Sequence, residues 1–373
     1  MDKYQIEMVL YLLREGIGIP NSDCDDSLFG SVDWKEVHHE AGMQALTGIL
    51  FEGMSKTVEA GLCSIDKPLM LGWFGEVMMI ERMNLRLNKV LAELVGLLRQ
   101  AEIPFVVMKG QVAASLYPNP LRRQPGDIDI LVGDGYFDAA CQLLEMEGAT
   151  AGEVAPEKHT EYRFHEAVVE MHHTMLDLSN PSAMDYIASL DLRELTEVTK
   201  VADYSVPGFK PAFNCAYMLG HMVHHLLTEG LGLRQVCDWM LLMRAIEAGR
   251  YGDTETLKAE IRQHVGGLGL ENAYEAFLML GIRDFGLSEE VWKTDCGKRA
   301  ERNAADLLDF ILSSGNFGKK ENQKKSSHSL SGNISNAWLY LKHVAKMRNI
   351  APNEVRHFFK TRTKRWIKKK RNH

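Results

Sequence analysis

The sequence predicts an α+β fold, with an α/β module between N-terminal and C-terminal helical regions. Two short apolar segments, 105–108 and 127–132, suit buried strands, and a pair of strand-like segments follows at 162–165 and 167–173. Helical patterns lie before and between these segments, an order that is typical of a sheet covered by helices. The chain has 373 residues, of which 45% are hydrophobic and 25% charged, so it can bury a large core.

Helical periodicity accounts for most of the remaining chain. Near the N-terminus, Ile6, Val9, Leu10 and Leu13 fall on one helical face. Asp33 precedes a second helical pattern and is its expected N-cap. The further segments with apolar residues at helical spacing are 34–54, 77–100, 112–117, 136–147, 212–227 and 233–248.

These patterns divide the chain into five parts. The expected parts are an N-terminal helical region at 1–80, an α/β core at 81–182, a helical domain at 183–312, a flexible loop at 313–333, and a C-terminal helix with a basic tail at 334–373. The loop is expected because its segment is rich in Ser, Gly, Asn and Lys.

Charge is distributed unevenly along the chain. The net charge of −7 argues against a protein that binds nucleic acid over its whole surface. From Val355 to the end, however, there are nine Lys or Arg and no Asp or Glu. This basic tail predicts a weak contact with nucleic acid or with an acidic membrane surface, although many basic chain ends are only solvated.

Cysteine usage and hydropathy predict a cytoplasmic protein without a membrane span. The six cysteines include no C-x-x-C pair, which argues against zinc ribbons and thioredoxin chemistry. Scattered cysteines are typical of reduced thiols. Lys3, Glu7 and Arg14 interrupt the first apolar stretch, unlike the pattern of a secretion signal. No apolar run reaches the roughly 18 residues that a spanning helix needs.

Two acidic residues stand at alternate positions of the second predicted strand. Side chains alternate between the faces of a strand, so Asp127 and Asp129 are expected on one face, while Ile128 and Ile130 point into the core. Two carboxylates held so close repel each other unless a cation lies between them. Mg²⁺ prefers oxygen ligands and keeps positions open for water and phosphates, so this pair predicts a magnesium site.

This region resembles the uncharacterised nucleotidyltransferase family, within the superfamily of polymerase-beta-type nucleotidyltransferases. The motif residues shared with that family are Lys109-Gly110, Leu116-Tyr117, Pro120, Arg122 or Arg123, Gly126 to Val132, and Glu170-Met171-His172. The resemblance is specific over about 80–240, and it implies a nucleotidyltransferase-like mixed β-sheet. Where the superfamily usually has Gly-Ser at the first turn, this chain has Lys109-Gly110, so a positive charge replaces a hydroxyl.

The resemblance implies a metal-dependent transfer of a nucleoside monophosphate from a nucleoside triphosphate such as ATP, with release of pyrophosphate. It implies that Asp127, Asp129 and Glu170 are the catalytic residues and bind Mg²⁺, as one or two ions that Mn²⁺ can replace. Glu161 and Glu166 are the alternatives to Glu170 as the third carboxylate. Lys109, Gly110, Arg122 and Arg123 are the implied nucleotide-binding residues. The acceptor stays open among small molecules, proteins and RNA, because it depends on the shape of the cleft and not on the motif.

Two other interpretations stay open at this stage. The first is a non-catalytic nucleotide- or nucleic-acid-binding module with the same fold. The second is a phosphohydrolase that uses His221, His225 and Asp238. The two histidines stand four residues apart, a spacing compatible with zinc, but the pattern is not H-E-x-x-H and favours a polar helix–helix network. His172 and His173 follow Glu170; either is expected to make hydrogen bonds beside the site, with a place near the metal or a role in orienting the acceptor as the alternative.

Overall fold

The computed structural model describes residues 3–19, 21, 26–133, 135–155, 159–292, 297–318, 344 and 347–371. Contacts between Cα atoms group the chain into two compact units. The first unit contains Met1–Met175, Leu192–Lys210 and Met240–Ala245. The second unit contains Leu176–Asp191, Pro211–Trp239 and Ile246–His373. The five-part division drawn from the sequence stays a prediction.

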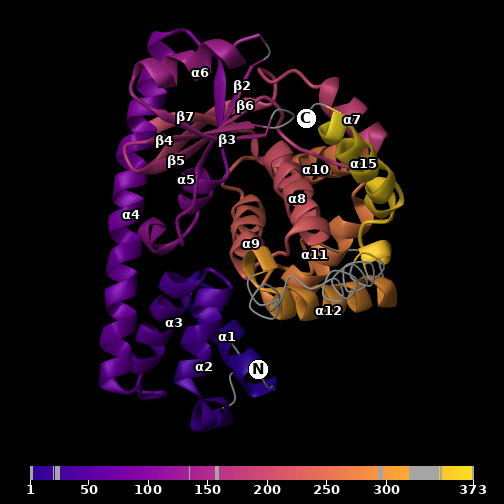
Figure 1. Cartoon of the computed structure of the whole chain (residues 1–373). Coiled ribbons are helices and arrows are strands. Elements are labelled where there is room, and N and C mark those ends of the chain that lie inside the picture. The colour runs from indigo at the N-terminus through magenta and orange to yellow at the C-terminus, as the bar shows by residue number, and fades with distance from the viewer. Residues whose placement is uncertain are drawn as a thin grey trace. The chain divides into compact units, whose positions relative to one another are not determined.

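Helices form the N-terminal part of the first unit (Figure 1). They are α1 (Lys3–Gly16), the 3₁₀ helix η1 (Asp26–Ser31), α2 (Trp34–Met43), α3 (Thr47–Glu59) and α4 (Lys67–Gln100). Asp33 caps α2 as predicted, because its side chain accepts hydrogen bonds from two backbone N–H groups of the first turn. The single helix predicted over 34–54 was wrong: Ala45 has φ 56°, a left-handed conformation that ends one helix before the next begins.

A mixed five-stranded sheet follows α4 and confirms the predicted α+β class. Its strands are β1 (Phe105–Met108), β2 (Ile128–Val132), β3 (Thr150–Ala155), β4 (His159–Phe164) and β5 (Ala167–His172), in the order β1-β2-β5-β4-β3. The pairing of β2 with β5 is parallel, and the other three pairings are antiparallel. The connections contain α5 (Gly110–Ala114), the 3₁₀ helix η2 (Pro120–Arg122) and α6 (Phe137–Met146). The first unit also contains a hairpin of β6 (Thr196–Val201) and β7 (Tyr204–Phe209).

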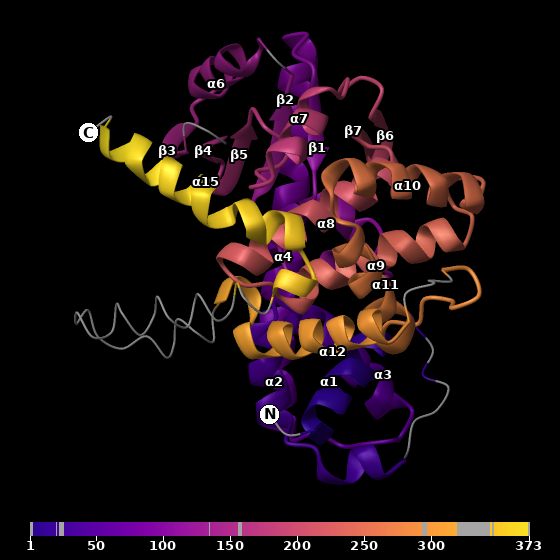
Figure 2. The same cartoon turned by 90° about the vertical axis from the view of Figure 1, so that its right-hand side faces the viewer.

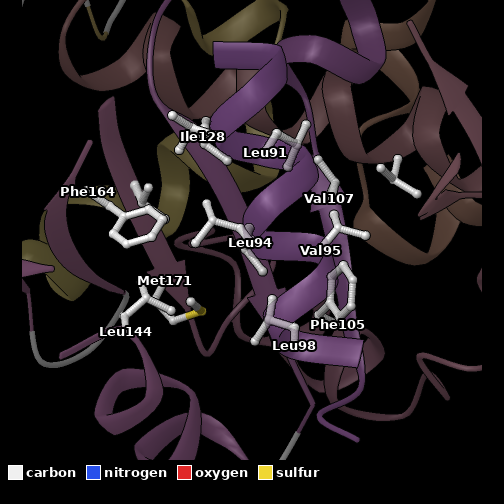
Figure 3. Close-up of a cluster of buried hydrophobic side chains, with 14 of the residues drawn as sticks. Leu91, Leu94, Val95, Leu98, Phe105, Val107, Ile128, Leu144, Phe164 and Met171 are labelled. Carbon is white, nitrogen blue, oxygen red and sulfur yellow. The ribbon is translucent and has the colours of Figure 1, made fainter. Parts of the chain in front are cut away.

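One face of the five-stranded sheet is apolar and packs against α4 (Figure 3). The helix contributes Leu91, Leu94, Val95 and Leu98, all of them almost fully buried. The strand residues in the same core are Phe105, Val107, Ile128, Ile130, Val132, Tyr162, Phe164, Val169 and Met171, together with Leu144 of α6. Because side chains alternate along each strand, the intervening polar residues lie on the opposite face of the sheet.

The second unit is helical in its described part. Its elements are α7 (Pro181–Ala188), α8 (Pro211–Thr228), α10 (Thr254–Leu268), α11 (Glu271–Asp284), α12 (Gly297–Ser314), the 3₁₀ helices η3 (Asn316–Gly318) and η4 (Met347–Asn349), and α15 (Pro352–Arg371); α9 (Leu233–Glu247) has residues in both units. Within the unit α8 packs on α10, and α11 packs on α12 (Figure 2). No described helix has the length and hydropathy needed to cross a bilayer.

One prediction for the C-terminal half needs correction, and another falls largely outside the described residues. The region after 183 is not helical throughout, because β6 and β7 form an antiparallel hairpin within it. Most side chains of β6 are at least partly exposed. The strand therefore needs no alternation of apolar and polar residues, which is the pattern by which a half-buried strand is predicted. Of the loop predicted over 313–333, the residues after Gly318 lie outside the described part of the chain.

We expect truncation of Leu94 to show how strongly the apolar face of the sheet depends on α4. Leu94 is fully buried, whereas Leu85 on the same helix is 50% exposed. Leu94→Ala is expected to lower the free energy of unfolding by about 2–5 kcal/mol because it leaves a cavity. Leu85→Ala is the control and is expected to change it by less than about 1 kcal/mol. Equal losses in chemical denaturation would show that this packing does not hold the sheet.

Candidate metal and nucleotide site

Three carboxylates meet on the polar face of the sheet. The parallel pairing of β2 with β5 places Asp129 directly beside Glu170, so that both side chains leave the same face. Asp127 lies one residue before β2, and its carboxylate joins the other two. Oxygen atoms of Asp127, Asp129 and Glu170 all lie within 4.8 Å of one another. We refer to these three residues as the carboxylate cluster.

The turn after β1 brings a lysine to the carboxylate cluster. Met108, the last residue of β1, pairs with Asp129, so the next residue lies at the same end of the two strands. Lys109 adopts φ 50° and ψ −137°, a backbone conformation that is strained for a residue with a side chain. Gly110 follows with φ 42°, where a Cβ atom would add strain. This turn places Lys109 Nζ 2.9 Å from Asp129 Oδ1.

Two histidines border the cluster. His172 Nε2 lies 3.0 Å from Asp129 Oδ1 and 3.0 Å from Glu170 Oε2, so its imidazole holds the two carboxylates together. This agrees with the hydrogen-bonded position expected for His172. The ring of His173 packs against Phe137. His159 of β4 lies with Nδ1 3.6 Å from the same oxygen of Glu170, and the sequence interpretation did not include it.

The carboxylates differ in how their negative charge is balanced. The neighbouring Asp129 raises the pKa of Asp127 to about 6, and burial acts in the same direction. Burial would also raise the pKa of Asp129, but Lys109 and the hydrogen bond from His172 outweigh it and hold this pKa well below its usual range. Burial alone would raise the pKa of Glu170, but the hydrogen bond from His172 and the charges of His159 and His172 together lower it. Asp127 is therefore the carboxylate whose charge is least compensated.

The donor atoms of this cluster suit a hard divalent cation. Mg²⁺ takes oxygen ligands, commonly one or two carboxylates together with water and substrate phosphates. Asp127 and Asp129 provide such a pair and Glu170 adds a third carboxylate, while a cation between them would relieve the repulsion that raises the pKa of Asp127. The three residues therefore fit the metal that the sequence predicted for them.

The two arginines proposed as phosphate contacts have other partners. Arg122 forms ion pairs with Glu52 of α3 and Glu81 of α4. Arg123 is buried, with 4% of its surface exposed. The side-chain amide of Asn84 donates hydrogen bonds to the carbonyl oxygens of Leu121 and Arg123. These contacts anchor the segment before Asp127 to the N-terminal helices.

The histidine pair of α8 forms no metal-ligand group with Asp238 among the described residues. His221 and His225 are joined by a contact of 3.0 Å between their Nε2 atoms. His224 Nδ1 lies 2.8 Å from the carbonyl oxygen of Asp177. The arrangement agrees with a polar network within the second unit, the interpretation that the sequence favoured over a hydrolase site.

The raised pKa of Asp127 makes a prediction for the stability of the metal-free protein. A carboxyl whose pKa rises from 3.8 to about 6 on folding keeps a proton that the unfolded chain releases. Its contribution to stability is therefore present below about pH 4 and is lost as the pH rises through about 6. We expect the wild-type Tm, measured in EDTA, to fall relative to that of Asp127→Asn across this window. Parallel curves of Tm against pH for the two proteins would contradict a raised pKa for Asp127.

Comparison with known proteins agrees with the motif-based resemblance. The family model described as an uncharacterised nucleotidyltransferase matches residues 30–280. Among solved structures, the chain is similar to an antigenic nucleotidyltransferase-like protein from Paracoccidioides brasiliensis, with 14% sequence identity and a TM-score of 0.31; the match covers 48% of this chain and 86% of that chain. No curated protein matches the chain. Since the family match covers more than half of its length, the chain belongs to the uncharacterised nucleotidyltransferase family.

Proposed function

We propose that the chain is a metal-dependent nucleotidyltransferase. It transfers a nucleoside monophosphate from a nucleoside triphosphate, such as ATP, to an acceptor and releases pyrophosphate. The observation that carries this proposal is the convergence of the Asp127, Asp129 and Glu170 oxygens within 4.8 Å on one face of the sheet. Membership of a nucleotidyltransferase family supports the class of reaction.

The carboxylate cluster is the proposed binding site for Mg²⁺, as one or two ions, with Mn²⁺ as a substitute. Both ions accept oxygen ligands in six-coordinate sites, so the same carboxylates serve either of them. When bound, the metal offsets the charge that develops on the transferred phosphoryl group and aligns the attacking and leaving oxygens. The protein contributes a rigid frame, because Asp129 and Glu170 lie on adjacent strands in fixed register.

Lys109 and Gly110 are the proposed contacts for the triphosphate. Lys109 Nζ lies at the cluster, 2.9 Å from Asp129 Oδ1, so its positive charge is beside the residues that would hold the metal. A lysine ammonium is a point charge that suits the β- and γ-phosphates. Gly110 has no side chain to block the approach of the phosphates to the backbone. The strained conformation of Lys109 keeps its ammonium close to the site.

Glu170 and His172 are proposed to handle the acceptor. Glu170 is the third metal ligand and the group that accepts the proton of the attacking hydroxyl. His172 positions the carboxylates of Glu170 and Asp129 through its Nε2 contacts of 3.0 Å to each of them. We propose that Arg122 and Arg123 anchor the segment before Asp127. Arg122 pairs with the carboxylate of Glu52, and Arg123 donates a hydrogen bond to the backbone carbonyl of Gln124.

Several features of the function stay as predictions from the sequence. The acceptor is a small molecule, a protein or RNA. A weak nucleic-acid contact is proposed for α15, the basic C-terminal helix that extends over Pro352–Arg371. A cytoplasmic location is proposed from the scattered cysteines, of which Cys63, Cys141, Cys215 and Cys237 are free thiols among the described residues.

A non-catalytic binding module with the same fold is the second candidate. It is favoured by one observation: Lys109 and His172 already balance the charge of Asp129, so the cluster is partly neutralised by the protein itself. Incubation with labelled nucleoside triphosphates and Mg²⁺ separates the two candidates. Release of pyrophosphate or labelling of an acceptor supports the transferase, whereas binding without any release supports the module.

Replacement of both aspartates is expected to abolish transfer while preserving the fold. Asp127→Asn with Asp129→Asn removes two charged metal ligands at nearly constant volume, so Mg²⁺-dependent turnover should fall by at least about 10³-fold. Nucleoside triphosphate binding that depends on Mg²⁺ should be lost in equilibrium dialysis. Asp138→Asn on the exposed surface of α6 is the matched control and should behave as the wild type. Unchanged binding and turnover in the double variant would overturn the proposed function.

A further inference from the structure

A second group of metal-ligand side chains lies on the polar face of the sheet, next to the carboxylate cluster. In the β4–β5 hairpin, His159 is the register partner of His172. Side chains that stand directly opposite each other in an antiparallel pair lie on the same face. The two imidazole rings accordingly have centroids 5.0 Å apart. Glu170 stands two residues before His172, so strand alternation places it on the same face.

Nitrogen and oxygen atoms of these three residues converge on a small volume. His172 Nε2 lies 3.0 Å and His159 Nδ1 lies 3.6 Å from Glu170 Oε2. All three ligand atoms lie within 4.8 Å of one another. Ligands at bonds of about 2.1 Å stand roughly 3.0 Å apart around a six-coordinate ion and roughly 3.4 Å apart around a four-coordinate ion. The two distances to Glu170 Oε2, 3.0 and 3.6 Å, are therefore close to those between neighbouring ligands of such an ion.

The environment of the group is partly shielded and still open to solvent. The side chains of His159, Glu170 and His172 are 20%, 19% and 12% exposed. A metal can therefore enter, while the partial burial strengthens its attraction to the carboxylate. His172 Nε2 lies at hydrogen-bond distance, 3.0 Å, from an oxygen of Asp129 and from an oxygen of Glu170. A metal ion bound to His172 Nε2 and Glu170 would replace the hydrogen bond between these two groups.

We propose that His159, Glu170 and His172 form a second metal site, which takes a borderline divalent transition ion such as Mn²⁺, Fe²⁺, Co²⁺ or Zn²⁺. Two imidazoles and one carboxylate favour such ions, whereas Mg²⁺ favours ligands that are all oxygen. The two sites share Glu170, whose two carboxylate oxygens allow it to bridge a pair of ions. The inference extends the proposed function, since it gives the transferase one oxygen-only ion and one histidine-bound ion.

Optical titration with Co²⁺ in the absence of nucleotide tests this site separately from catalysis. Excess Mg²⁺ is added first, because it fills the oxygen-only site and absorbs no visible light. The wild type is expected to bind one Co²⁺ with visible absorption bands that Mg²⁺ does not displace. His159→Ala should weaken this binding by at least about tenfold, because it removes one nitrogen ligand. Near-UV circular dichroism checks that the variant keeps its fold.

Two further variants act as controls. His165→Ala removes a histidine of the same hairpin whose side chain is 56% exposed and contacts Glu93, so Co²⁺ binding should stay as in the wild type. Asp127→Asn weakens only the oxygen-only site and should also retain the bands. The proposal is overturned if His159→Ala binds Co²⁺ as tightly as the wild type, or if Asp127→Asn loses Co²⁺ to the same extent. Neither result bears on the pyrophosphate-release assay of the wild type, which tests the transferase proposal independently.

Discussion

Parallel pairing of β2 with β5 is the constraint on which the candidate site depends. These two strands are far apart in the sequence, yet their register sets Asp129 beside Glu170 and brings both carboxylates to the polar face of the sheet. The opposite face of the same strands is fixed by the apolar packing of α4 (Figure 3). A shift of one residue in register would exchange the two faces and bury the carboxylates in the core. The same strand register therefore sets both the hydrophobic core and the acidic site.

The rest of the site responds to the negative charge that this pairing concentrates. Lys109, held in a strained turn, and His172, at the end of β5, both contact Asp129. They stabilise its ionised form, and the repulsion between the aspartates raises the pKa of Asp127 instead. A protein that only needed a stable sheet would place neutral residues here, because burying several like charges is costly. The arrangement supports the proposed site for a cation and an anionic substrate.

The sequence contained enough information to predict the strands at the centre of the sheet and the residues of the carboxylate cluster. The apolar strand patterns and the motif around Asp127 and Glu170 are local features. His159 was missed because its partnership with His172 arises from the register of a hairpin, which a two-residue turn with positive φ at His165 and Glu166 determines. At the break the left-handed position holds Ala45, and the nearby Gly42 lies within the last turn of α2, so a single helix was predicted there.

Anomalous diffraction from crystals that contain Mn²⁺ and a non-hydrolysable nucleoside triphosphate is the most direct test of the central claim. The account predicts a manganese peak with oxygens of Asp127 and Asp129 at roughly 2.0–2.5 Å and with Glu170 in the same ligand group. Phosphate oxygens should complete the coordination, and Lys109 should then contact phosphate. An ordered triphosphate with no metal at these carboxylates, and with Lys109 and His172 still paired with Asp129, would contradict the account.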